Sequence, residues 1–350
     1  MTGQSQAGGH GSTNVQAAGD VVVHAGASLE EVRQIALDVF HANFLELRGH
    51  AEQVAGERAE RITNAFLVAL QQRAPQALES ASNPDMQRAL FSAQREYACS
   101  GDEDLETVLV DLLVDRAGEG SSRGVRTIVL NEAINAAPKL TSHQRRAIAV
   151  CFLMRYTRPH GQGTVDAFYE HFVRDNLVPL GRGLPTSDTD YQHIEYVGAG
   201  SMSLLSPEFG DALVGKARGL FTRGFTRQET SEILGELLDD PRVVMPCLRD
   251  EARLQLQVVH RDDIPAWAES LGCPDREQTL RNVLDMGLLS SEEAQREMVE
   301  REPATRELID AWQSSSLHNL RLTTVGLAIG HGYWRRVTGG DSPLNVWLSD

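Results

Sequence analysis

Hydrophobic residues recur at a helical period along most of the chain. Between residues 28 and 73, apolar positions such as Val32, Ile35 and Val39 follow one another at spacings of three and four residues. This spacing is typical of an amphipathic helix. Gly49 is a possible interruption. We therefore predict a long helical block, which begins with a capping box and ends before a proline (Ser28, Glu31, Pro75).

The same period predicts a multi-helical body. Phe40 and Phe44 stand four residues apart in the first block, so we expect them to pack in the core. Further helices are expected over residues 84–99, 104–117, 127–137, 142–155, 165–176, 207–221, 226–238, 244–259, 264–271, 276–286, 291–299, 303–313 and 324–336. The fold class that follows is mainly α.

Strand patterns are short and few. Residues 319–323 and 345–348 alternate between apolar and polar side chains on either side of a predicted helix. They predict a small C-terminal strand-helix-strand element that is winged-helix-like. One further hairpin is possible near residues 190–205.

The first 27 residues differ from this body. They are rich in glycine and carry β-branched residues on both sides of a turn at residues 17–20. An isolated hairpin is marginally stable, so its edges need partners, most simply the same segment of other copies. We predict that this β-forming tag drives self-association through Val15, Val21, Val22 and Val23. The alternative is a disordered glycine-rich tail.

Prolines and glycines divide the body into parts. Seven of them crowd residues 178–207, which predicts a loop-rich junction. Binding sites concentrate in such loops. The predicted organisation is a tag, an N-terminal helical domain, the junction and a C-terminal helical domain (1–27, 28–177, 178–207, 208–350).

Composition narrows the class of protein. The 350 residues carry a formal net charge of −16, which disfavours general binding to nucleic acids or anionic membranes. The longest apolar run, residues 147–154, is too short to span a bilayer. The first 26 residues contain no Lys or Arg and no long apolar stretch, so we expect a cytoplasmic protein. The four cysteines lie far apart, without a CxxC pair, and are expected to pack as small hydrophobic residues.

Basic residues gather around one predicted helix. Arg145, Arg146, Arg155 and Arg158 spread around its circumference instead of forming a stripe. We interpret them as a solvated face. A role in contacting phosphate is the alternative.

Two groups that contain acidic residues are candidates for a metal or catalytic site. Asp111 and Asp115 share a helix face, as a metal or general-acid site requires, although a charged outer face is favoured. His260 precedes Asp262 and Asp263, which are well placed to cap the helix from residue 264. A catalytic His–Asp pair also requires a nucleophile and an oxyanion site.

Cofactor and metal motifs are not indicated. Residues 198–203 are glycine-rich but lack the spacing of a phosphate-binding loop. The histidines are scattered without a metal-binding spacing. No catalytic residue, cofactor or metal ligand is therefore predicted.

Five segments carry a resemblance to a known family. They are Asn14–Asp20, Val32–Phe44, Val129–Ile134, Pro138–Thr141 and Leu322–Gly326. Together they resemble a family of uncharacterised bacterial proteins with a glycine-rich tag and an all-α body. The family has no assigned reaction or catalytic residues. Tags of this kind also front some bacterial conflict and phage-defence proteins.

Two functional hypotheses follow. The first is a non-enzymatic scaffold that self-associates through its tag and binds a protein partner, in bacterial defence or stress response. The alternative is an enzyme or small-molecule sensor with its site in residues 178–207. The sequence favours the first, because it shows no catalytic motif.

Overall fold

The computed structural model describes residues 29–120, 124–159, 161, 163–204 and 206–348, with side chains from residue 49 onward apart from Ser82. The chain comprises two compact units, residues 1–55 and 56–350. All sites discussed below belong to the second unit.

Three predictions lie outside the described residues. The tag over residues 1–27, with the proposed contacts of Val15, Val21, Val22 and Val23, is one of them. The cap at Ser28 is another. The side chains of Phe40 and Phe44 are the third, so their burial stays a prediction.

The first helix is a single element. α1 (Leu29–Arg73) continues through Gly49, where an interruption was considered. A glycine inside a helix costs only about 1 kcal/mol relative to alanine, so it does not by itself end one. In the second unit this helix buries Ile62, Phe66 and Leu70, which lie four residues apart.

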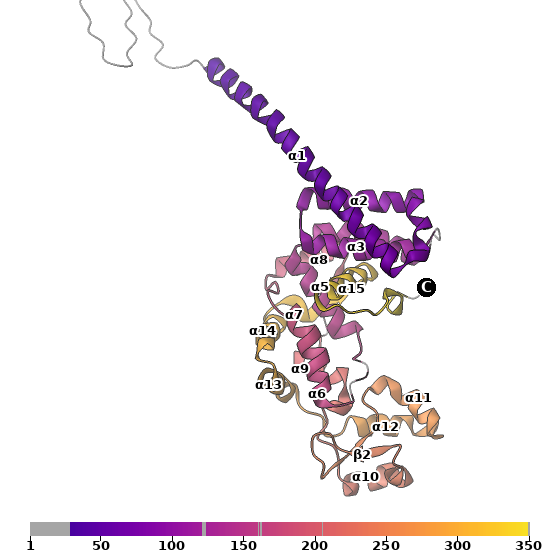
Figure 1. The fold of residues 1–350 in the computed structure, drawn as a ribbon. Coiled ribbons are helices and arrows are strands. Elements are labelled where there is room, and N and C mark those ends of the chain that lie inside the picture. Colours follow the sequence, from indigo (N-terminus) through magenta and orange to yellow (C-terminus); the bar gives the residue numbers. More distant parts are fainter. Residues whose placement is uncertain (1–28, 121–123, 160, 162, 205, 349–350) are drawn as a thin grey trace, which may run out of the picture. The chain divides into compact units, whose positions relative to one another are not determined.

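The main core of the second unit surrounds a C-terminal helix. α15 (Thr324–Thr338) packs against α3 (Glu103–Gly118), α4 (Val125–Ala136) and α5 (Ser142–Tyr156) (Figure 1). Gly330 permits the close approach of α5, because a Cβ atom there would lie 2.9 Å from the Cβ of Phe152.

Local sequence signals account for several helix boundaries. Thr141 and Gln144 form a capping box at the start of α5, and Thr323 caps α15. α2 (Pro84–Ser100) has proline in its first turn and ends at Gly101 in the left-handed conformation. Its buried residues are Met86, Ala89, Leu90, Ala93 and Tyr97, the set that the helical period selects.

A smaller core surrounds a hairpin. β2 (Val244–Pro246) and β3 (Leu254–Leu256) pair antiparallel, and their side chains pack with those of three helices (Figure 1). These are α10 (Arg227–Leu234), α11 (Ile264–Ser270) and α12 (Glu277–Leu284). The helix predicted over residues 244–259 is wrong. Proline inside a helix removes a hydrogen bond and clashes with the preceding turn, and Pro246 lies there.

The C-terminal element also differs from its prediction. β4 (Leu320–Leu322) forms as expected, but it pairs antiparallel with β1 (Gly200–Met202). The strand predicted at residues 345–348 is a 3₁₀ turn, Leu344–Val346. The winged-helix-like element is therefore wrong, because β4 meets a strand more than a hundred residues away. The mainly α fold class is confirmed among the described residues.

The remaining elements complete the helical body. Residues 178–207, predicted as loop-rich, contain a nine-residue helix that starts at a Ser187 cap. This helix is α8 (Asp188–Tyr196). The remaining α- and π-helices are α6 (Val165–Ala167), a π-helix (Phe168–Leu177), α7 (Val178–Leu180), α9 (Phe209–Lys216), α13 (Ser291–Arg301) and α14 (Arg306–Ser314). None of the described helices combines the length and the apolar character that crossing a membrane requires.

Candidate functional site: a basic pocket at the ends of α5 and α9

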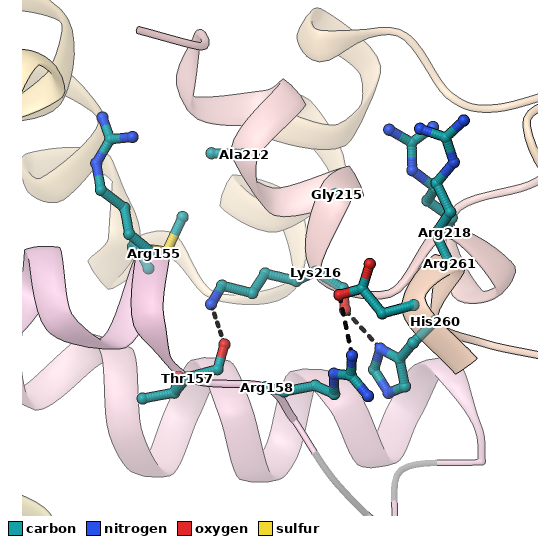
Figure 2. A pocket seen from close by; sticks show the side chains of 11 residues that line it. Arg155, Thr157, Arg158, Ala212, Gly215, Lys216, Arg218, His260 and Arg261 are labelled. Atoms are coloured by element: carbon teal, nitrogen blue, oxygen red, sulfur yellow. Dashed lines mark hydrogen bonds and ion pairs between the residues drawn. The ribbon is translucent and has the colours of Figure 1, made fainter. Parts of the chain in front are cut away.

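Two helix ends and a turn enclose a basic pocket. The C-terminal ends of α5 and α9 meet the turn at residues 260–262 around a cavity of about 310 Å³ (Figure 2). This volume lies at the lower end of the range for small-molecule sites. The lining residues, here called the basic pocket, are Met154, Arg155, Thr157, Arg158, Ala212, Gly215, Lys216, Arg218, His260, Arg261 and Asp262.

Lys216 lies at the inner wall of this pocket. It is the last residue of α9 and is 9% exposed. Its Nζ donates a hydrogen bond to the carbonyl oxygen of Thr157 (Figure 2). No carboxylate of the described residues pairs with it. Burial of the ammonium group lowers the pKa of Lys216 to about 7.

Three arginines of the pocket have carboxylate partners. Arg158 contacts Asp262 at 2.9 Å and Asp263 at 2.6 Å. Asp285 pairs with Arg218 at 2.5 Å and with Arg261 at 3.5 Å. Counting these partners, five Lys and Arg side chains face three carboxylates, so the pocket keeps an excess of positive charge in an acidic chain.

Arg155 adds charge but points elsewhere. Its guanidinium donates to the carbonyl oxygen of His318 and lies 5.3 Å from the ring centre of Trp312. Figure 2 shows it directed away from Lys216. Burial lowers the pKa of Arg155. Arg155 therefore contributes a positive field to the pocket and not a direct contact at its centre.

His260 is held by the end of α9. Its Nδ1 lies 2.8 Å from the carbonyl oxygen of Lys216. A carbonyl oxygen only accepts, so Nδ1 carries the proton in this contact. The end of α9 thus orients the imidazole at the backbone of Lys216, whereas the Lys216 side chain extends toward Thr157 (Figure 2).

An aromatic cavity adjoins the basic pocket. Its volume is about 540 Å³, and it shares Thr157 and Arg158 with the pocket. The indole nitrogen of Trp347 donates to the carbonyl oxygen of Tyr156 at 2.6 Å. Trp334 also lines it. Residues 342–347 form one wall, which is joined to α15 by the bond between His331 Nε2 and the carbonyl oxygen of Ser342 (2.8 Å).

The interpretation of the arginines as a solvated face is wrong for part of the set. Arg145 is 1% exposed and pairs with Asp102, the N-cap of α3. Arg155 and Arg158 line the basic pocket, whereas Arg146 is half-buried at the opposite end of α5, where it donates to the carbonyl oxygen of Arg182. Helical spacing places these arginines around α5, but α3, α9 and the 260–262 turn cover them.

The acidic pair of α3 is not an outer face. Asp111 is 6% exposed and pairs with Arg73. Asp115 is half-buried, and burial raises its pKa to about 6. The predicted solvated face is wrong because α3 is buried on almost every side. No group of three histidine, cysteine or acidic side chains that suits a metal occurs among the described residues.

Two further candidates have structural roles. Asp262 and Asp263 were predicted to cap α11, and this prediction is wrong. Their side chains pair with Arg158 instead. Gly200 serves strand pairing: a Cβ there would lie 2.6 Å from Leu320 Cδ1. Residues 200–202 of the segment 198–203 therefore form a strand and not a phosphate loop.

The cysteines have different environments. Cys151 and Cys247 are buried, as expected for small hydrophobic residues, whereas Cys99 is exposed and Cys273 is intermediate. Burial raises the pKa of Cys151 to about 12, so its nucleophilic thiolate form is suppressed.

Sequence reasoning missed Lys216. One signal was present: the chain has 33 basic residues, of which Lys139 and Lys216 are the two lysines. A residue type used so rarely stands out where it is buried beside arginines.

Comparisons with known proteins give a family and no activity. No curated protein and no solved structure matches the chain. One protein-family model, described only by the suffix "-like", matches residues 26–348. The match covers the helical body and most of the chain, and the chain therefore belongs to this family.

Proposed function

We propose that this chain is a binding protein for a small anionic ligand, held in the basic pocket. The observation that carries the proposal is Lys216, a buried cation whose donor reaches only a backbone carbonyl. A buried charge is costly unless it is paired. An anion in the cavity would provide the missing charge.

The charge of the pocket supports an anion over other ligands. Its cations exceed its carboxylates, although the whole chain carries a net charge of −16. Arginine forks are suited to the oxygen atoms of phosphate and carboxylate groups. The proposal therefore develops the phosphate-contact alternative for Arg158, with Arg155 adding to the positive field, and it belongs to the class of small-molecule sensors. It does not use residues 178–207.

Calorimetric titration with inorganic phosphate tests this function. We expect wild type to bind phosphate and Lys216→Met to bind it at least about ten-fold more weakly, a difference of about 1.4 kcal/mol. Lys139→Met is the matched control, because Lys139 is exposed and lies outside the pocket. Equal phosphate affinities of wild type and Lys216→Met would contradict the proposal. Absence of phosphate, sulfate and carboxylate binding at millimolar concentration would do the same.

The scaffold hypothesis is kept as a separate proposal. It holds that the chain is a cytoplasmic homo-oligomer that binds a protein partner in bacterial defence or stress response. Its tag residues lie outside the described part of the chain. Replacing Val21 and Val23 by Asp should abolish the higher oligomer in equilibrium sedimentation while leaving the helical body folded. An unchanged mass would reject self-association through the tag.

A further inference from the structure

The choice of lysine in the basic pocket is unusual for this chain. Arginine provides 31 of the 33 basic side chains. Lys139 is exposed on the surface, and Lys216 is buried in the pocket. An arginine stays protonated under all physiological conditions, whereas a buried lysine can lose its proton and become a nucleophile. The position that lines the pocket thus carries the one side-chain amine that burial can deprotonate.

Burial and the charge of Arg155 on α5 favour the neutral amine of Lys216. Cys151 on α5 and the Phe172 ring of the π-helix, 5.8 Å from Nζ, favour the charged form. The one carboxylate of the lining, Asp262, is engaged by Arg158. The other polar or charged groups that line the same pocket are Thr157, Arg218, His260 and Arg261.

We propose that Lys216 forms an imine with an aldehyde or ketone that carries an anionic group, such as a phosphorylated carbonyl compound. This inference rests on the proposed function, since the excess positive charge of the pocket would attract the anionic group. The carbonyl carbon would then lie at the Nζ of Lys216. Access is given by the cavity that this residue lines.

The reaction needs no oxidant or reductant. The lone pair of Nζ forms a bond to the carbonyl carbon, and one Nζ proton is transferred to the carbonyl oxygen to give a carbinolamine. The C–O bond then breaks, and that oxygen takes up the second Nζ proton and leaves as water while the C=N bond forms. One molecule of water is released for each imine.

The lowered pKa of Lys216 agrees with this chemistry. With a pKa of about 7, a large fraction of Lys216 is neutral near physiological pH. For an ordinary lysine that fraction is well under one in a thousand. The neutral amine is the reactive form.

Reductive trapping tests the inference in the full-length chain. The protein is incubated with pyridoxal 5′-phosphate, an anionic aldehyde, reduced with sodium borohydride and digested for peptide mass spectrometry. We expect modification of Lys216 to exceed that of Lys139 by at least about ten-fold, despite its burial. Inorganic phosphate should suppress the adduct at Lys216 and leave that at Lys139 unchanged.

Two matched comparisons separate the parts of the proposal. Pyridoxal, which lacks the phosphate, should lose most of the preference for Lys216. An equal preference with both aldehydes would overturn the role of the anionic group. Lys216→Arg removes the side-chain amine, so it should form no adduct at position 216.

The outcomes distinguish this inference from the proposed function. If phosphate binds to wild type but Lys216 is modified no faster than Lys139, imine formation is rejected and anion binding stands. If phosphate does not bind and Lys216 is not labelled, both are rejected. Because Lys139 is an internal standard in wild type, the test does not depend on the folding of any variant.

Discussion

Buried basic side chains at the two ends of α5 have different partners. At its start, Arg145 is 1% exposed and pairs with Asp102, and it also donates to the carbonyl oxygen of Leu140. Beyond its end, Lys216 is 9% exposed and reaches only the carbonyl of Thr157. Both ends bury a positive charge, but only the first supplies a counter-ion.

The difference separates a structural site from a binding site. Arg116 repeats the first arrangement, because it is 2% exposed and pairs with Asp85 while donating to Asn131 at 3.1 Å. In both pairs the arginine is buried and the carboxylate reaches solvent, so removing the carboxylate would leave a buried charge uncompensated. A buried cation that lines a cavity without such a partner is instead available for a ligand.

The largest expected effect tests the paired end. Arg145→Met should lower the free energy of unfolding by about 3–5 kcal/mol, because it leaves Asp102 without its partner. Denaturant titration measures this loss. Arg146→Met, at the half-buried neighbouring position, is the control and should cost less than about 1 kcal/mol. A loss below that value for Arg145→Met would remove the contrast between the two ends.

His331 extends the comparison to a buried base without a carboxylate. Burial lowers its pKa to about 4 from an ordinary value near 6.5. Between these values the unfolded chain binds the proton and the folded chain does not. Stability should therefore fall by about 3 kcal/mol as the pH drops from 6.5 to 4. Urea midpoints of wild type and His331→Gln over this window measure the effect, and parallel profiles would contradict it.

Lys216 should show a dependence at higher pH. Its folded pKa of about 7 lies below the ordinary lysine value of 10.5, so the unfolded chain binds more protons between these values. The stability of wild type should rise relative to Lys216→Met by about 2–3 kcal/mol between pH 7 and pH 9. Thermal unfolding of both proteins at matched ionic strength tests this. A constant difference would indicate a lysine that stays charged when folded.

The smallest expected effect gives the sharpest view of the pocket. Lys139→Arg should change stability by less than about 0.5 kcal/mol, because the site is exposed. It leaves Lys216 as the single lysine, so a protein labelled with ¹³C-lysine gives one side-chain signal in NMR. That signal should titrate near pH 7, and phosphate should move its midpoint upward. A midpoint near pH 10 without phosphate would contradict the claim that Lys216 is buried without a carboxylate partner.

Sequence by itself determined the helical body and many of its boundaries. The period of apolar residues in α2 selects its buried set, and Thr141 and Thr323 act as caps where the pattern places them. These features depend on residues within one or two turns of each other, so a local pattern contains the information. Pro246 is also a local signal, because a proline at this position argues against the helix predicted over residues 244–259.

Only the tertiary structure decided which charges are neutralised. Asp102 reaches Arg145 from 43 residues away, and the pocket around Lys216 depends on Thr157, 59 residues earlier, and on His260, 44 residues later. Helical spacing places a side chain on a face but does not say what covers that face. The basic pocket exists because separate helix ends converge, and the cost of burying a charge depends on the partners that this convergence supplies.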